Sequence, residues 1–169
     1  MPISASDIQF RLSGGAANSD VNASLGGAKS SVQIVDATLH NLFDIVGGQE
    51  SLDGDIEYRC VYIHNAHGSL SLQNAKVWIE TNTPSADTTV AIALAGEGLN
   101  GTAETIANEN TAPIGESFSS PSSFGAGLSL GTIPTVQHYA LWIRRTVTAG
   151  AAAFNTDSVV LKVQGETAA

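Results

Sequence analysis

Two of the four histidines stand close enough in the sequence to suggest metal chemistry. His64 and His67 lie in the segment IHNAHGS, at the end of an alternating stretch. A zinc site needs two ligands that converge and further ligands from elsewhere in the fold. Because strand side chains alternate between faces, a spacing of three suits a turn better than one strand face. We interpret the pair as a hydrogen-bonded turn and predict no metal ligand there.

The single cysteine, Cys60, lies within the strand-like segment IEYRCVYIHN. No histidine or cation is locally fixed beside it to stabilise a thiolate, so we expect a buried thiol that packs as a small apolar side chain. One cysteine also excludes an intrachain disulfide, and no signal-peptide pattern is present. We therefore expect the chain to fold in a reducing cytoplasm.

Two stretches carry alternating side-chain oxygens of the kind that calcium binds: Asn18, Asp20 and Asn22 in the first, and Asp53, Asp55 and Glu57 in the second. Calcium takes about six to eight oxygen ligands, so either stretch supplies only part of a site. We interpret the first stretch as turns capped by Asx side chains. The second is interpreted as a turn followed by the solvated face of a strand.

Catalytic motifs are missing from the sequence. It has no phosphate-binding loop, dinucleotide-binding glycine motif, GxSxG turn or HExxH pair. Aromatic residues make up 6% of the chain, which leaves little for a sugar platform. Trp78 and Trp142 stand between apolar neighbours and are predicted to pack in the core. We predict a protein that is not an enzyme and has no cofactor.

The charge balance bears on the kind of partner. Lys and Arg number 7 and Asp and Glu 16, for a formal net charge of -9. Nucleic acids and anionic membranes attract clustered Lys and Arg, so neither is an expected partner. Charged residues make up 14% of the chain, against about a quarter in an average soluble domain. A neutral polar surface loses little hydration when it packs against another protein.

The elements that must position these residues are strands. Alternating segments separated by turn formers follow one another from residue 32 onward: 31–46, 56–65, 75–81, 88–95, 138–147 and 158–164. No segment shows a sustained helical period. This pattern predicts an all-β fold, a single antiparallel β-sandwich of Ig-like or jelly-roll type spanning residues 32–169.

Two segments are patterned too weakly to predict strands throughout. Residues 1–31 contain two glycine pairs and are predicted to form an extended N-terminal arm, in which only Ile8, Phe10 and Leu12 alternate. Residues 100–127 form a long loop. We hypothesise that both segments make intersubunit contacts.

Arg144 and Arg145 form a cationic pair inside a strand-like segment. Adjacent strand residues point to opposite faces, so the two guanidinium groups have different surroundings. We predict that one pairs with an acidic residue of a neighbouring subunit, an intrachain salt bridge being the alternative. The hypothetical interface residues are Ile8, Phe10, Leu12, Arg144 and Arg145.

Four segments cover most of the chain: IQFRLSGGAANSDVNASLGG, LHNLFDIVGGQESLDGDIEYRCVYIHN, VWIETNTPSADTTVAIAL and LWIRRTVTAGAAAFNTDSVVLKVQGE. Together they resemble small virion proteins of tailed bacteriophages. GTIPTVQHYALWIRRTV followed by DSVVLKVQGE is also similar to the last two strands of an Ig-like domain. The resemblance brings no catalytic residue with it.

The resemblance implies a capsid decoration (cement) protein, made in the host bacterial cytoplasm and located in the virion. Such a protein typically forms a homotrimer whose arm and loops bridge subunits of the major capsid protein. The alternatives are a tail, baseplate or fibre component that binds other virion proteins, and a carbohydrate-binding or adhesin module. The last would require an exposed aromatic patch or a complete calcium site.

Overall fold

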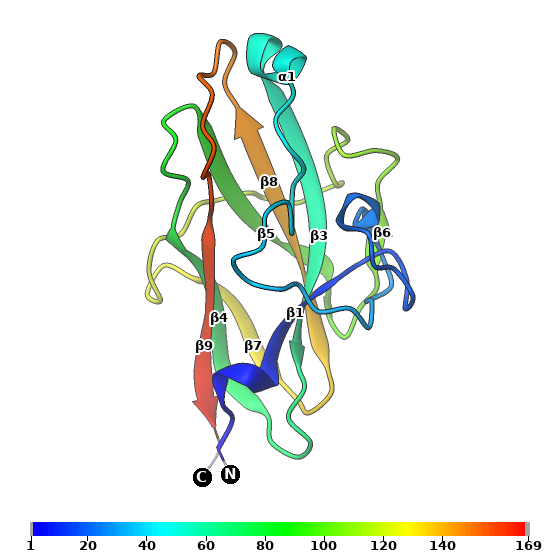
Figure 1. The fold of residues 1–169 in the computed structure, drawn as a ribbon. Coiled ribbons are helices and arrows are strands. Elements are labelled where there is room, and N and C mark those ends of the chain that lie inside the picture. Colours follow the sequence, from blue (N-terminus) through cyan, green and yellow to red (C-terminus); the bar gives the residue numbers. More distant parts are fainter. Residues whose placement is uncertain (1, 168–169) are drawn as a thin grey trace.

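Two antiparallel sheets face each other in the computed structural model, which describes residues 2–167 (Figure 1). The larger sheet has the strand order β1-β3-β8-β5 and the smaller one β7-β4-β9. The strands of the larger sheet are β1 (Ile8–Leu12), β3 (Asp55–Asn65), β5 (Thr88–Leu99) and β8 (His138–Val147), and those of the smaller sheet are β4 (Leu72–Thr81), β7 (Leu128–Ile133) and β9 (Val160–Thr167). The predicted all-β sandwich is therefore confirmed.

Short elements complete the fold. A small ladder pairs β2 (Gly26–Gly27) with β6 (Ala103–Thr105). Two 3-10 turns, η1 (Ala5–Asp7) and η2 (Val21–Ala23), and one six-residue helix, α1 (Gly48–Asp53), are the helical elements of residues 2–167. No helix in this part of the chain has the length and apolar character needed to cross a membrane.

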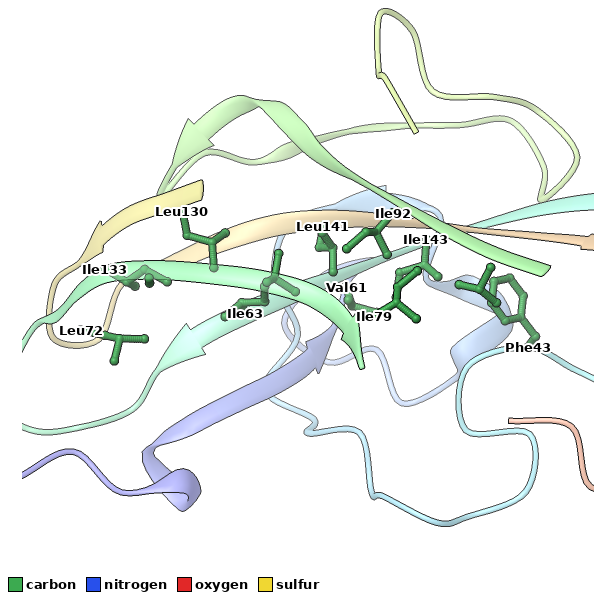
Figure 2. Packing of buried hydrophobic residues seen from close by; sticks show 13 residues of the cluster. Phe43, Val61, Ile63, Leu72, Ile79, Ile92, Leu130, Ile133, Leu141 and Ile143 are labelled. Atoms are coloured by element: carbon green, nitrogen blue, oxygen red, sulfur yellow. The ribbon is translucent and has the colours of Figure 1, made fainter. Parts of the chain in front are cut away.

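The main core lies between the two sheets. Figure 2 shows Val61 and Ile63 of β3, Leu141 and Ile143 of β8, and Ile79 of β4 within one cluster. These residues alternate along their strands, because every second side chain points to the same face. Each such side chain contributes about 1.5–3 kcal/mol when it is fully buried. The apolar residues that alternate in the sequence are thus the ones that pack between the two sheets.

A second core lies on the opposite face of the larger sheet. Cys60, Tyr62 and Trp142 are all 0% exposed there, and Leu25 and Phe118 from two loops pack against this cluster. Cys60 thus packs as a buried apolar side chain, as predicted, and burial raises the pKa of its thiol. The larger sheet is therefore covered on both faces.

The N-terminal segment does not form the extended arm predicted for residues 1–31. Its β1 pairs antiparallel with β3, from Ile8 opposite Asn65 to Leu12 opposite Val61. After β1 the chain folds back, and the Ser30 amide donates to the Leu12 carbonyl at 2.8 Å. The prediction was wrong because a segment poor in apolar residues can still be held by backbone hydrogen bonds to an open strand edge.

A glycine allows this segment to approach the rest of the fold. Gly26 has a φ of +94°, and a Cβ at this position would collide with the Glu104 carbonyl oxygen. Its amide donates to the buried Ser13 hydroxyl at 3.1 Å. A residue with a side chain would be excluded both by the left-handed backbone and by the close contact of β2 with β6.

Candidate functional site

The three apolar residues predicted as interface contacts face the chain's own core. Ile8 and Phe10 pack against the main cluster, and Leu12 is 2% exposed. The alternation in this segment did predict a strand. It could not say that the apolar face would be covered by the same chain.

The arginine pair divides between the two faces of β8, as predicted. Arg145 pairs with Glu57, and its Nη1 donates to the Asp44 carbonyl oxygen at 2.9 Å. The Arg144 guanidinium lies 5.2 Å from the centre of the Phe118 ring on the opposite face. Arg145 thus forms the intrachain salt bridge that was the alternative to an intersubunit pair.

Arg145 belongs to a charge cluster at one end of the main core, formed by Asp44, Glu57, Arg59, Glu109 and Arg145. Arg59 is 0% exposed and donates to Glu109 at 2.5 Å and to the Asn22 side-chain oxygen at 3.1 Å. The Phe43 ring lies 4.8 Å from the Arg145 guanidinium carbon and 5.5 Å from that of Arg59. Figure 2 shows Phe43 at one end of the labelled apolar side chains.

The carboxylates of this cluster are close enough to resemble a cation site. Oxygens of Asp44, Glu57 and Glu109 lie within 4.8 Å of one another. However, Arg145 contacts Glu57 and Asp44, and Arg59 contacts Glu109. The two guanidinium groups already pair with all three carboxylates and offset two of their three negative charges, and they would repel a divalent ion at this distance. We therefore interpret the charge cluster as an ion-pair network.

Within the charge cluster, the pKa of Glu57 is shifted by its surroundings. Glu57 is 1% exposed, and burial raises its pKa from 4.5 to about 7, against the opposing effects of Arg145 and Arg59. The neighbouring Asp44 adds to the rise. Within residues 2–167, neither Glu57 Oε1 nor Asp44 Oδ1 has a hydrogen-bond partner, although both atoms are buried. A proton on the Glu57 carboxyl group would remove one of the three negative charges of the cluster, which the two arginines would then balance.

The charge cluster does not amount to an organised catalytic cleft. A hollow of about 320 Å³ opens beside it, with Asn22, Asp44 and Glu109 in its lining. Glu57, which has the perturbed pKa, is not part of that lining. A general acid or base must reach the proton it transfers, and this carboxyl group is enclosed by the protein.

Sequence reasoning did not find the charge cluster. Glu57 was predicted to lie on a solvated strand face, and this was wrong because it shares the inward face of β3 with Val61 and Ile63. The alternation of inward and outward side chains along residues 56–65 could have predicted the burial of Glu57. Glu57 and Arg59 continue the parity of the apolar inward residues, so buried charges were to be expected at that end of the strand.

The other candidate ligands have the structural roles predicted for them. The Asp20 side chain accepts from the Asn22 amide and the Asn18 side chain from the Asp20 amide, both at 2.9 Å. His67 Nδ1 accepts from the amides of Ser69 and Leu70 at 3.1 and 3.0 Å. The Asx-capped turns and the histidine turn are thus confirmed.

His64 lies opposite His138 on the neighbouring strand, not beside His67. Burial and the nearby charges of Lys29 and Arg11 lower the pKa of His64 to about 4. The imidazole is therefore neutral at physiological pH. Within the described residues, neither histidine belongs to a group of three or more metal-ligating side chains.

Several large apolar side chains remain on the surface. Val35, Leu39 and Ile45 are 65%, 75% and 72% exposed, although Phe43 of the same segment is only 9% exposed and lies in the main core. In the long loop 100–127, Ile114 is 85% exposed. These segments are attached to the sandwich and display apolar groups outward.

Comparisons with protein-family models, with curated proteins and with solved structures find no match for this chain.

Proposed function

We propose that this protein is a structural component of a bacteriophage virion, and that it acts as a capsid decoration protein on the major capsid lattice. The observation that carries the proposal is the set of exposed apolar side chains on residues 32–47. Val35, Leu39 and Ile45 each expose more than half of their surface. Three large apolar side chains exposed on one short segment offer another protein apolar surface to bury.

The composition supports the same function. A net charge of -9 with only 14% charged residues leaves a surface rich in neutral polar groups. Such groups can be desolvated against a partner at lower cost than ions. On a symmetric lattice, linked copies would bind tightly even if each contact is weak, because later contacts form at high effective concentration.

The anchoring of the contact segment also favours binding. Phe43 holds residues 32–47 against the core, and the Asn41 side chain donates to the Val35 carbonyl at 2.7 Å. A segment that is ordered before binding loses less conformational entropy when it docks. The same reasoning applies to loop 100–127, where Ser119 and Ile92 exchange backbone hydrogen bonds at 2.8 and 3.0 Å.

The first test is cryo-electron microscopy of purified virions with the number of copies counted. Clusters of many copies on the outer capsid would support the decoration role. A few copies at the tail tip or baseplate would replace it with the tail role, and absence from the particle would reject both.

The second test is a binding comparison on particles lacking the protein. The triple variant V35S/L39S/I45S should lose occupancy, because each substitution removes apolar contact area. V136S is the matched control, since Val136 is 64% exposed but lies outside both proposed contact segments. Equal occupancy of the triple variant and the control would contradict the proposed contact surface.

A further inference from the structure

The outer edge of β9 is open. β9 pairs with β4 on one side, and no backbone hydrogen bond within the described chain joins residues 160–167 to any other segment. It runs along the margin of the sandwich, in red at the left of Figure 1. An unpaired edge of this length presents a row of free N–H and C=O groups that another strand can complete.

The two edge strands of the larger sheet, β1 and β5, are instead partly covered by other segments of the chain. Residues 32–34 cover β1, with the Leu12 amide donating to Val32 at 3.1 Å and the Ile34 amide to Phe10 at 2.8 Å. β5 is bridged by Ser119. The chain thus covers parts of these two edges with its own segments and leaves β9 uncovered.

The residues of β9 are complementary to themselves in one antiparallel register. If two copies of β9 meet about a two-fold axis at Gln164, Lys162 of each copy lies directly opposite Glu166 of the other. Val163 then lies opposite Gly165. Moving the axis by one residue in either direction removes both opposite-charge pairs.

We propose that β9 pairs with β9 of a second copy of this chain in this register, so that the smaller sheets of the two copies form one continuous sheet. Opposite charges directly across an antiparallel pair stabilise it, and like charges destabilise it. β7, the other edge of the smaller sheet, has the sequence LSLGTI and offers no charge to match Lys162. The complementarity therefore favours the two-fold contact.

The side chains that would meet are on the outer side of the sheet and accessible. Lys162 is 51% exposed and lies 3.4 Å from Glu80 and 5.6 Å from the centre of the Trp78 ring. Glu166 accepts from the Asn74 side chain at 2.9 Å. These contacts are with residues of β4, on the paired side of β9. Pairing across the open edge would turn both side chains from these partners toward the opposite charges of the second copy. A two-fold contact also closes on itself and does not continue into fibres.

This contact is a property of the protein alone and does not depend on the proposed place in a virion. It also differs from the trimer that the sequence resemblance implies. A lysine on an edge strand can instead serve to prevent strand pairing. The single reversal K162E separates the two roles of Lys162. It weakens association if Lys162 pairs with Glu166 of the second copy, and does not weaken it if Lys162 prevents strand pairing.

The experiment is sedimentation velocity over a dilution series with the wild-type chain, K162E, E166K and the double variant K162E/E166K. We expect a wild-type dimer, a dissociation constant roughly 10–100-fold higher for each single reversal, and restoration in the double variant. D36K is the charge-matched control for E166K, since Asp36 is exposed and lies outside β9. Thermal melting of each variant checks that the fold is intact.

Hydrogen exchange provides an independent readout. Amides of residues 160–167 should become more protected as the wild-type concentration rises, and those of E166K should not. A monomer at every concentration, or an oligomer whose mass is unchanged by either single reversal, would overturn the proposal. So would a double variant that associates no better than the single ones.

Discussion

The wild-type protein should lose folding stability as the pH rises toward neutrality, because the buried Glu57 must then give up its proton. Replacing Glu57 with glutamine should remove this pH-dependent part of the stability. Glu57 is 1% exposed and pairs through Oε2 with Arg145, whereas its Oε1 has no hydrogen-bond partner within residues 2–167. Arg59, Asp44 and Arg145 are the charged groups that act on it. Glutamine keeps the shape of the side chain but has no proton to gain or lose.

The sign and size of this stability change follow from the pKa values of Glu57 in the folded and the unfolded protein. Burial raises the pKa of Glu57 from 4.5 to about 7, so the folded protein holds this proton more tightly than the unfolded chain. The resulting stability is fully present below pH 4.5 and is lost as the pH rises through about 7. At about 1.4 kcal/mol for each tenfold change, the loss amounts to about 3 kcal/mol.

The assay is urea unfolding of the wild type and E57Q at intervals from about pH 4 to pH 8. The free energy of unfolding of E57Q minus that of the wild type should increase by about 3 kcal/mol across this range. E80Q is a control of opposite sign, because the hydrogen bond from Trp78 lowers the pKa of Glu80. A difference between E57Q and wild type that stays constant from pH 4.5 to pH 8 would refute the raised pKa.

Three further predictions concern the parts of the fold that hold the N-terminal segment. Y62F should cost about 1–3 kcal/mol in urea unfolding, because the hydroxyl accepts from the buried Ala103 amide at 2.9 Å and that amide would lose its partner. G26A should lower the melting temperature by several degrees through backbone strain at φ +94°, whereas G68A, which meets no atom within 4 Å, should have little effect; equal effects would contradict the strain argument. Deletion of residues 1–12 should destabilise the sandwich as well as weaken particle binding, because β1 is part of the larger sheet; an unchanged urea midpoint would show that β1 contributes nothing.

The sequence by itself determined the all-β class and the strands near 56–65, 75–81, 88–95, 138–147 and 158–164. It did not predict β7, and the strand-like segment 31–46 is irregular in the structure. Alternation with a period of two is a local property, so the apolar face of segments such as 138–147 can be identified without the fold. Trp142 and Cys60 were predicted to be buried, and both are 0% exposed. The His67 turn was also predictable, because its hydrogen bonds join residues two and three positions apart.

Only the tertiary structure decided which segments cover which edges. Residues 1–31 contain too few apolar side chains to predict order, yet β1 binds the open edge of β3, with paired residues 49 to 57 positions apart in the sequence. Arg59 of the charge cluster likewise contacts Asn22 and Glu109, which no local pattern relates to it. Backbone hydrogen bonds and ion pairs between distant segments depend on which groups the fold leaves unpaired, and that depends on the complete arrangement of strands.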